Sequence, residues 1–100
     1  MKRDLERIKR ILERELPEIR KKYGVKRLGI FGSYIRGEET PRSDLDILIE
    51  FEEDARISLI DFIELEYYLS DILGVKVDLV EKKALKPRIG KRILEEVVYI

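Results

Sequence analysis

The sequence predicts one small domain built from both α-helices and β-strands. Three short segments alternate apolar and polar residues, as strands with one buried face do, and longer segments around them repeat apolar residues at helical spacing. A chain of 100 residues contains enough apolar material for one modest core. We therefore expect residues 1–100 to form a single domain, with any functional site carried by the elements that build this core.

Two amphipathic segments predict the principal helices. Apolar residues recur along one face of residues 2–15, Pro17 interrupts the pattern, and it resumes over residues 19–23. Because proline suits the first turn of a helix, we expect either two helices or one kinked helix here. Another helix is expected from 57 to 73, ended by Gly74, and its apolar arc is wider than one sheet face requires.

Three strands are expected, at residues 25–31, 44–51 and 75–80. Along the second, apolar residues occupy one face, whereas the other face begins with two acids. The chain then continues through a basic segment, residues 82–92, into a helix that contains the apolar residues between 93 and 98. Helices and strands thus follow one another around a single predicted core.

The composition excludes several classes of site. The chain has 21 basic and 21 acidic residues, so its net charge of zero gives no overall attraction to nucleic acid or membranes. It contains neither cysteine nor histidine, which excludes thiolate nucleophiles, imidazole bases and Cys/His zinc sites. Any bound metal must be a hard cation held by oxygens. Neither a signal peptide nor a membrane-spanning run is predicted, and a cytoplasmic location is expected.

The stretch from Leu28 to Ile49 carries the chemistry. Asp44 and Asp46 alternate along a predicted strand, so their side chains point the same way, about 6–7 Å apart along the backbone. Such a pair favours a neutralising magnesium ion, and a third acid would allow two ions to act on a phosphoryl transfer. Asp78 is the candidate third ligand and general base. Alone, these acids would more often be solvated residues on a sheet surface.

Gly32 and Ser33 add a phosphate-binding turn to this interpretation. Gly32 lets the backbone approach a ligand closely, while the hydroxyl of Ser33 and the amides of the next helical turn can receive phosphate oxygens. Arg36 or Arg42 would supply a charged fork for a triphosphate. The same residues would also suit an ordinary turn with solvated arginines.

The spacing of these motifs resembles the signature of the polymerase-beta-like nucleotidyltransferase superfamily. Gly32-Ser33 is followed by ten residues and then by Asp44-Leu45-Asp46, and the stretches 31–37 and 43–49 resemble the minimal nucleotidyltransferases of bacteria and archaea. The likeness runs from Leu5 through the last predicted helix. It implies an α+β fold, with a small, twisted, mixed β-sheet and helices packed on one face.

The resemblance also implies a function. ATP would be the donor and AMP the transferred group, and in characterised minimal members the acceptor is a tyrosine of a HEPN-domain toxin for which the protein is the antitoxin. By the same resemblance, Ser33 would contact the phosphates, and Asp44, Asp46 and Asp78 would hold magnesium.

Two other functions remain open: a non-catalytic antitoxin that neutralises its partner by occlusion, and a nucleotide sensor or RNA-binding accessory. The wide apolar arc of residues 57–73 suits docking or self-association, including a homo-oligomer, but would equally cover a thin core. The basic segment 82–92 suits a triphosphate or an acidic partner, or is a solvated helix start. Direct nucleic-acid binding is not expected, because few aromatic residues interleave with its charges.

Overall fold

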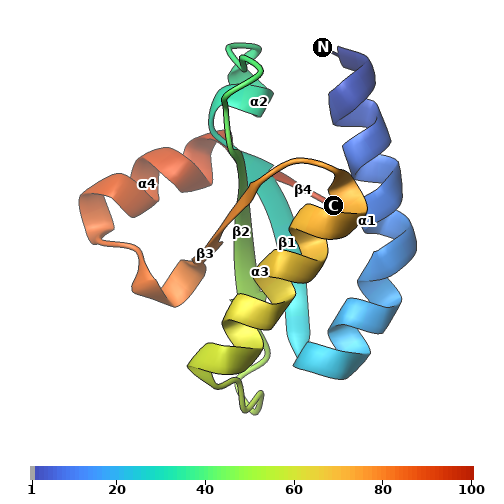
Figure 1. Ribbon diagram of the computed structural model, residues 1–100. Helices are drawn as coiled ribbons and strands as arrows, with labels where there is room; N and C mark the ends of the chain where they lie inside the picture. The colour runs from blue at the N-terminus through green and yellow to red at the C-terminus, as the bar shows by residue number, and fades with distance from the viewer. Residues whose placement is uncertain (1) are drawn as a thin grey trace.

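The structure is a computed structural model that describes residues 2–100, with side chains from Asp4 onward. Its elements lie around one twisted sheet (Figure 1). In chain order they are α1 (Lys2–Tyr23), β1 (Val25–Phe31), α2 (Ser33–Arg36), β2 (Leu45–Phe51), α3 (Leu59–Leu73), β3 (Val77–Glu81), the short 3-10 helix η1 (Lys82–Ala84), α4 (Pro87–Glu96) and β4 (Val98–Tyr99).

The sheet has the strand order β3-β2-β1-β4 and is mixed. β2 runs parallel to β3, whereas β1 is antiparallel to both β2 and β4. The predicted α+β class with a mixed sheet is therefore confirmed. In the register of the central strands, Asp46 lies opposite Phe31 on one side and Asp78 on the other. This pairing brings two predicted site residues, more than thirty positions apart in the chain, onto adjacent positions.

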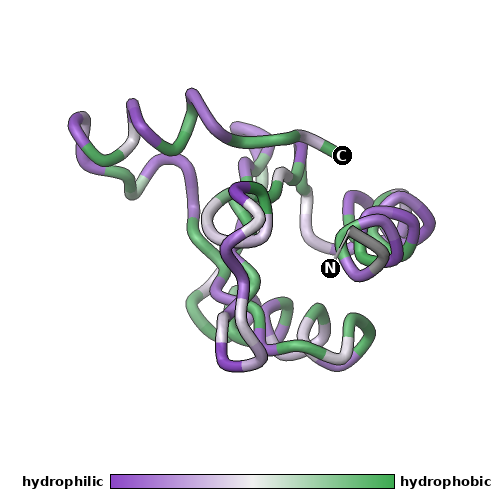
Figure 2. Tube along the Cα trace, turned by 90° about the horizontal axis from the view of Figure 1, so that it is seen from above, coloured by the Kyte–Doolittle hydropathy of each residue, from purple (hydrophilic) through white to green (hydrophobic). Residues whose placement is uncertain are grey.

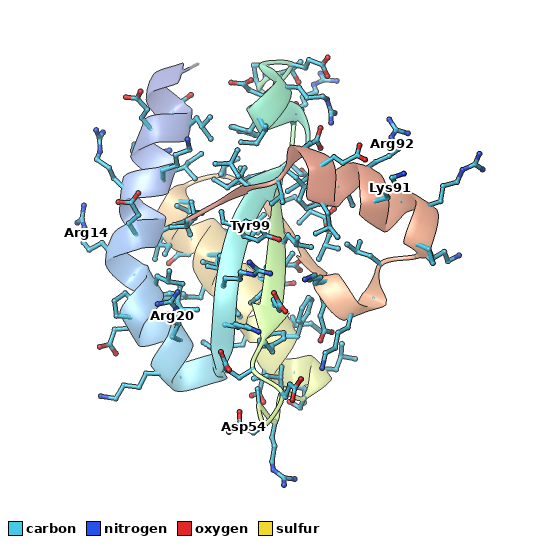
Figure 3. All side chains as sticks on the ribbon, turned by 180° about the vertical axis from the view of Figure 1, so that it is seen from behind. Arg14, Arg20, Asp54, Lys91, Arg92 and Tyr99 are labelled. Carbon is cyan, nitrogen blue, oxygen red and sulfur yellow. The ribbon has the colours of Figure 1, made fainter. Side chains whose placement is uncertain are left out.

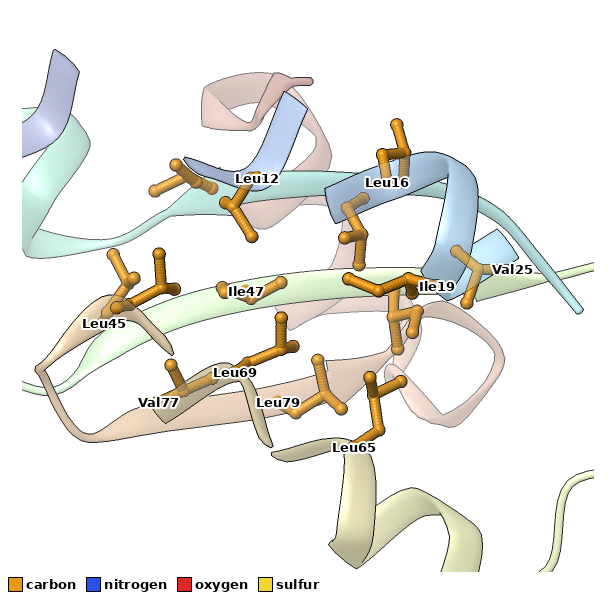
Figure 4. Packing of buried hydrophobic residues seen from close by; sticks show 14 of the residues in the cluster. Leu12, Leu16, Ile19, Val25, Leu45, Ile47, Leu65, Leu69, Val77 and Leu79 are labelled. Atoms are coloured by element: carbon orange, nitrogen blue, oxygen red, sulfur yellow. The ribbon is translucent and has the colours of Figure 1, made fainter. Parts of the chain in front are cut away.

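The main core lies between one face of the sheet and the helices α1 and α3 (Figure 4). Leu12 of α1, Ile47 of β2 and both Leu65 and Leu69 of α3 are fully buried in it. Burying each such side chain stabilises the fold by about 1.5–3 kcal/mol. Seen from above, α4 is set apart from α1 and α3 (Figure 2). The core helices thus hold the sheet from one side, which leaves the side of Asp46 for α4.

α1 is one helix with Pro17 inside it, so of the two expected alternatives the structure has a single helix and not two. Proline removes a single hydrogen bond, to the carbonyl four residues earlier, which here belongs to Glu13. Both Pro17 and Glu13 are exposed, so water can satisfy that carbonyl. Meanwhile Leu16 and Ile19 on the buried face keep the helix against the core. Core packing therefore keeps the helix continuous despite the hydrogen bond that proline removes.

The end of the chain also differs from the prediction. The last helix ends at Glu96, and Val98–Tyr99 form a fourth strand that pairs with Gly29 and Ile30 of β1. Gly29 makes this strand pairing possible, because a β-carbon at residue 29 would lie only 2.5 Å from Cγ2 of Val97. The β-branched pair 97–98 and a glycine inside a strand were both available signals for a strand at this edge.

The outer edge of β3 is covered by side chains of α3. The amide of Val77 donates to Oγ of Ser70 at 2.9 Å, and the amide of Leu79 donates to a carboxylate oxygen of Glu66 at 2.8 Å. β3 itself begins two residues later than expected, since Val75 packs against the core outside the strand. Both outward-facing amides in the first half of the strand are thus satisfied within the chain.

α3 begins two residues later than expected, because Ser58 and Asp61 form a reciprocal cap at its start. Gly74 ends the helix in the left-handed conformation, as predicted. The wide apolar arc divides in two. One part is buried in the core, and the other, comprising Leu59, Ile60, Ile63, Tyr67 and Tyr68, is exposed. Covering the core therefore accounts for only part of the arc.

No helix within residues 2–100 has the length and apolarity to cross a bilayer.

Candidate active site

The turn between β1 and α2 is shaped for a close approach to Asp46. Gly32 has φ 81° and ψ −152°, a conformation in which only glycine is readily accommodated. A β-carbon at Gly32 would overlap Oδ2 of Asp46. The Gly32 carbonyl accepts hydrogen bonds from the amides of Ile35 at 3.0 Å and Arg36 at 3.1 Å, which begin the single turn of α2. Backbone conformation and the neighbouring carboxylate both require glycine here.

The three predicted acids occupy neighbouring positions along β2 and β3. Asp44 immediately precedes β2, Asp46 is its second residue, and Asp78 pairs with Asp46 in the parallel register. Neighbours in such a register project to the same face of the sheet. Burial, followed by the negative charges of Asp78 and Asp44, raises the pKa of Asp46 to about 6. These neighbouring carboxylates therefore repel one another.

The donor set fits a divalent cation, although the side chains are not gathered around one point. All three groups are carboxylates, the ligands that magnesium prefers, and their mutual repulsion favours a cation between them. Among residues 4–100, however, no three acidic side chains converge closely enough to form a metal site. Oδ2 of Asp44 lies 3.9 Å from Nζ of Lys76. A cation that draws in Asp44 therefore competes with this lysine.

A cavity of about 280 Å³ joins the turn, the acid of β2 and the helix α4. One wall comes from the sheet and α2, namely Phe31, Gly32, Arg36 and Asp46, and the other from α4, namely Ile89, Arg92, Ile93 and Glu96. A larger hollow, of about 480 Å³, lies beside the start of α3, but its lining is mostly apolar and includes none of the predicted site residues. Of the predicted site residues, Gly32, Arg36 and Asp46 line the smaller cavity and none lines the larger one.

Glu96 is the site residue that sequence reasoning missed. The amide of Gly32 donates to Oε2 of Glu96 at 2.8 Å. Nη1 of Arg36 donates to Oε1 of Glu96 at 2.9 Å and to Oε2 at 3.1 Å. Burial alone would raise the pKa of Glu96, but these bonds from the Gly32 amide and Arg36 outweigh it and lower the pKa. No motif marks Glu96, although Ile89, Arg92 and Glu96 recur at the spacing of one helix face.

The remaining predicted phosphate ligands are less closely placed. Ser33 begins α2 directly after Gly32, as expected, and is partly buried. Arg42 lies in the turn 40–43, where the Thr40 carbonyl accepts from the Ser43 amide at 2.9 Å and the Arg42 amide donates to the Thr40 hydroxyl at 3.2 Å. Its side chain is exposed and is not among the residues that line the cavity. The structure thus gathers Gly32, Arg36 and Asp46 but leaves Arg42 outside.

The basic segment is only partly related to the cavity. Lys91 and Arg92 both project from α4 (Figure 3), and only Arg92 lines the cavity. Nζ of Lys82 lies 3.6 Å from a carboxylate oxygen of Glu50 on β2. Most of the other basic side chains are exposed, as expected for a solvated helix start.

Comparison with known proteins identifies this arrangement. The sequence profile of the nucleotidyltransferase domain matches residues 5–100. The chain belongs to this family. It is 52% identical, over 96 residues, to the protein adenylyltransferase MntA of Thermococcus cleftensis, with 96% of this chain and 95% of that protein covered. The predicted resemblance is thereby confirmed, and the protein is a nucleotidyltransferase enzyme.

Several solved structures have the same fold. One described as a minimal nucleotidyltransferase is 36% identical and superposes with a TM-score of 0.71, covering 92% of this chain and 87% of that one. A toxin–antitoxin complex with AMP-PNP contains a chain that superposes with a TM-score of 0.69 at 21% identity, covering 87% of this chain and 70% of that one. A complex of a tri-AMPylated Shewanella oneidensis HEPN toxin with its MNT antitoxin gives 0.60 at 19% identity, with 98% and 69% covered.

Proposed function

We propose that this protein transfers AMP from ATP to a hydroxyl group, that of a tyrosine, on a partner HEPN-type toxin, and that it acts as the antitoxin of that toxin. The observation that carries the proposal is the parallel pairing of Asp46 with Asp78 beside the Gly32 turn. The name of the Thermococcus relative, a protein adenylyltransferase, supports the transferred group. The toxin complexes whose antitoxin chains share this fold support the kind of partner.

In this proposal the residues of the site divide into phosphate ligands and metal ligands. The amide of Gly32, the hydroxyl of Ser33 and the guanidinium of Arg36 bind the phosphates of ATP, with Arg42 approaching from its exposed turn. Asp44, Asp46 and Asp78 hold magnesium, as two ions when all three acids take part. When bound, magnesium would supply positive charge that stabilises the phosphates during transfer.

Asp78 has a second role in this scheme. It is exposed and lies on β3, an edge strand, so a hydroxyl presented by another protein can reach it. Asp78 accepts the proton of that hydroxyl while the hydroxyl oxygen forms a bond to the α-phosphorus of ATP. The bond from that phosphorus to the bridging oxygen of the β-phosphate breaks, and pyrophosphate leaves. AMP remains on the partner.

Transfer of labelled AMP tests the proposal directly. The chain is incubated with ATP labelled at the α-phosphate, magnesium and a purified HEPN-type partner protein. Label is expected on the partner, and Asp44→Asn with Asp46→Asn is expected to reduce the transfer rate by at least about 1000-fold, because the cation loses two of its three ligands.

The matched control is Glu53→Gln with Asp54→Asn, which removes the same charge from the exposed loop after β2. This control should transfer AMP at the rate of the unaltered chain. Absence of label from the unaltered chain with its true partner would contradict the proposal. If the double asparagine variant still neutralised the toxin in cells, occlusion rather than transfer would explain antitoxin action.

A further inference from the structure

The Glu96 carboxylate occupies the binding groups that an anion would need. It accepts from the Gly32 amide at 2.8 Å and from Arg36 at 2.9 and 3.1 Å. A carboxylate with two oxygens held by a backbone amide and a guanidinium makes the same kind of contact as a phosphate group does. Glu96 therefore stands where an anionic part of a ligand would bind.

We propose that Glu96 is a built-in competitor of the triphosphate, and that nucleotide binding displaces its carboxylate from Gly32 and Arg36. This inference rests on the proposed function, since it concerns the phosphate ligands of that same site. The Gly32 amide has one hydrogen, so it cannot donate fully to Glu96 and to a phosphate oxygen together. Two anions held side by side would also repel each other.

The position of Glu96 in the fold allows this exchange. Glu96 is the last residue of α4, and the chain directly after it is fixed to the sheet, because Val98 and Tyr99 pair with β1. The main chain at this point is thus anchored, whereas the side chain of Glu96 has three rotatable bonds and is 25% exposed. Rotation of the side chain alone would release both contacts.

The charges that surround Glu96 act in both directions. Arg36 and Arg92 attract it, whereas Asp46, on the opposite wall of the cavity, is itself an acid whose charge Glu96 opposes. Replacing Glu96 by the phosphates of a magnesium-bound nucleotide exchanges one anion for another at Arg36 and brings a cation to the acids. The exchange relieves repulsion on the acidic wall without leaving Arg36 unpaired.

Glu96 would have the opposite effect if it only held the Gly32 turn in shape. A positioning role predicts weaker nucleotide binding when Glu96 is removed, and competition predicts tighter binding. The sign of the change therefore separates the two roles.

Equilibrium titration of the full chain supplies the test. ATP with magnesium and, separately, inorganic tripolyphosphate with magnesium are titrated into the unaltered chain, Glu96→Gln and Glu96→Ala. Glu96→Ala is expected to lower the apparent Kd for both ligands by about three- to tenfold, because the binding-competent fraction rises. Glu96→Gln keeps an acceptor for the Gly32 amide and removes the charge, so its gain should be smaller.

Glu95→Gln is the matched control, because it removes the same charge from the same helix at an exposed position. It should bind both ligands as the unaltered chain does. Circular dichroism confirms that each variant is folded. Unchanged or weaker binding by both Glu96 variants, with normal binding by the unaltered chain, overturns the inference and leaves the proposed function in place. If neither the unaltered chain nor any variant binds ATP or tripolyphosphate, this inference and the proposed function are both contradicted.

Discussion

The two halves of the site differ in how far their polar groups are satisfied within the chain. On the donor side, the Gly32 amide and Arg36 are both held by Glu96, and Arg36 also donates to Glu38 at 2.8 Å. On the acidic side, Asp46 faces two further acids, and burial and their charges raise its pKa to about 6. In the donor half, opposite charges pair within the chain. In the acidic half, the carboxylates repel one another.

This difference shows what each half requires from a ligand. The donor half accepts an anion only in exchange for Glu96, whereas the acidic half gains stability from a cation. A magnesium nucleotide supplies both charges in one molecule. The two halves meet at Gly32, whose amide belongs to the donor side and whose missing β-carbon leaves room for Asp46.

The largest effect is expected from Gly32→Ala, which breaks both halves together. The new methyl group would overlap Asp46 in a backbone conformation that only glycine adopts readily. We expect AMP transfer to fall by more than about 100-fold, because phosphate and metal ligands both move. The free energy of unfolding should fall by about 2–4 kcal/mol. Transfer assays and urea denaturation measure the two effects.

Gly37→Ala is the control for backbone strain alone. Gly37 also has a positive φ, 71°, but nothing lies within 4 Å of the place its β-carbon would take. It should cost about 1–2 kcal/mol of stability and leave transfer nearly unchanged. If Gly37→Ala lost as much transfer as Gly32→Ala, the contact with Asp46 would not be the cause.

A smaller effect, confined to the acidic half, is expected from Asp46→Asn on stability. The folded chain holds the Asp46 proton up to about pH 6, against an ordinary value of 3.8. Below about pH 3 the residue is mostly protonated in the folded and in the unfolded chain. Between about pH 4 and 6 the unfolded chain ionises Asp46 while the folded chain still holds the proton, so wild-type stability falls over this range and stays lower above it. Asp46→Asn should therefore raise Tm by about 2–5 °C at pH 7.5.

The same substitution should leave Tm nearly unchanged at about pH 3, where thermal unfolding by circular dichroism gives the reference. Asp54→Asn, in an exposed loop, should show no such dependence on pH. An equal or lower Tm for Asp46→Asn at pH 7.5 would mean that burial and the neighbouring acids do not make the charge of Asp46 destabilising. Activity and stability are thus expected to change in opposite directions at this residue.

The smallest effect is expected from Glu38→Gln, in the donor half. Glu38 pairs with Arg36 but makes no contact with Gly32, and both side chains of this pair are well exposed. Exposed pairs contribute little, so the apparent Kd for ATP should change by less than about twofold. A gain equal to that of Glu96→Ala would show that release of Arg36, and not of the Gly32 amide, controls binding.

The sequence was sufficient for the parts of the site that are local in the chain. Gly32 and Ser33 begin a helical turn, and Asp44 and Asp46 alternate along a strand, because these features depend on backbone periodicity. Asp78 was also placed correctly beside Asp46, since a strand with an apolar inner face leaves its acid on the other side. The family signature added the chemistry.

Features that depend on tertiary packing were not predicted. Nothing local to Glu96 indicates that α4 will bring it against Gly32, 64 positions away. The sequence left open whether one helix or two would form around Pro17, and the single helix α1 depends on the core contacts of Leu16 and Ile19 rather than on propensity. The fourth strand forms because β1 offers a free edge and Gly29 offers space. Gly29 could be read from the sequence, but the free edge of β1 becomes apparent only once the sheet is assembled.

The cover that α3 places over β3 has a consequence for the behaviour of the protein at high concentration. With the amides of Val77 and Leu79 already bonded to Ser70 and Glu66, this border presents few free donors to an incoming strand. Exposed strand borders otherwise act as templates on which identical chains assemble into fibrils. Ser70 and Glu66 thus disfavour strand pairing between copies of the chain at this edge. A partner protein that approaches the edge would contact mainly the side chains of β3 and α3 rather than free backbone amides.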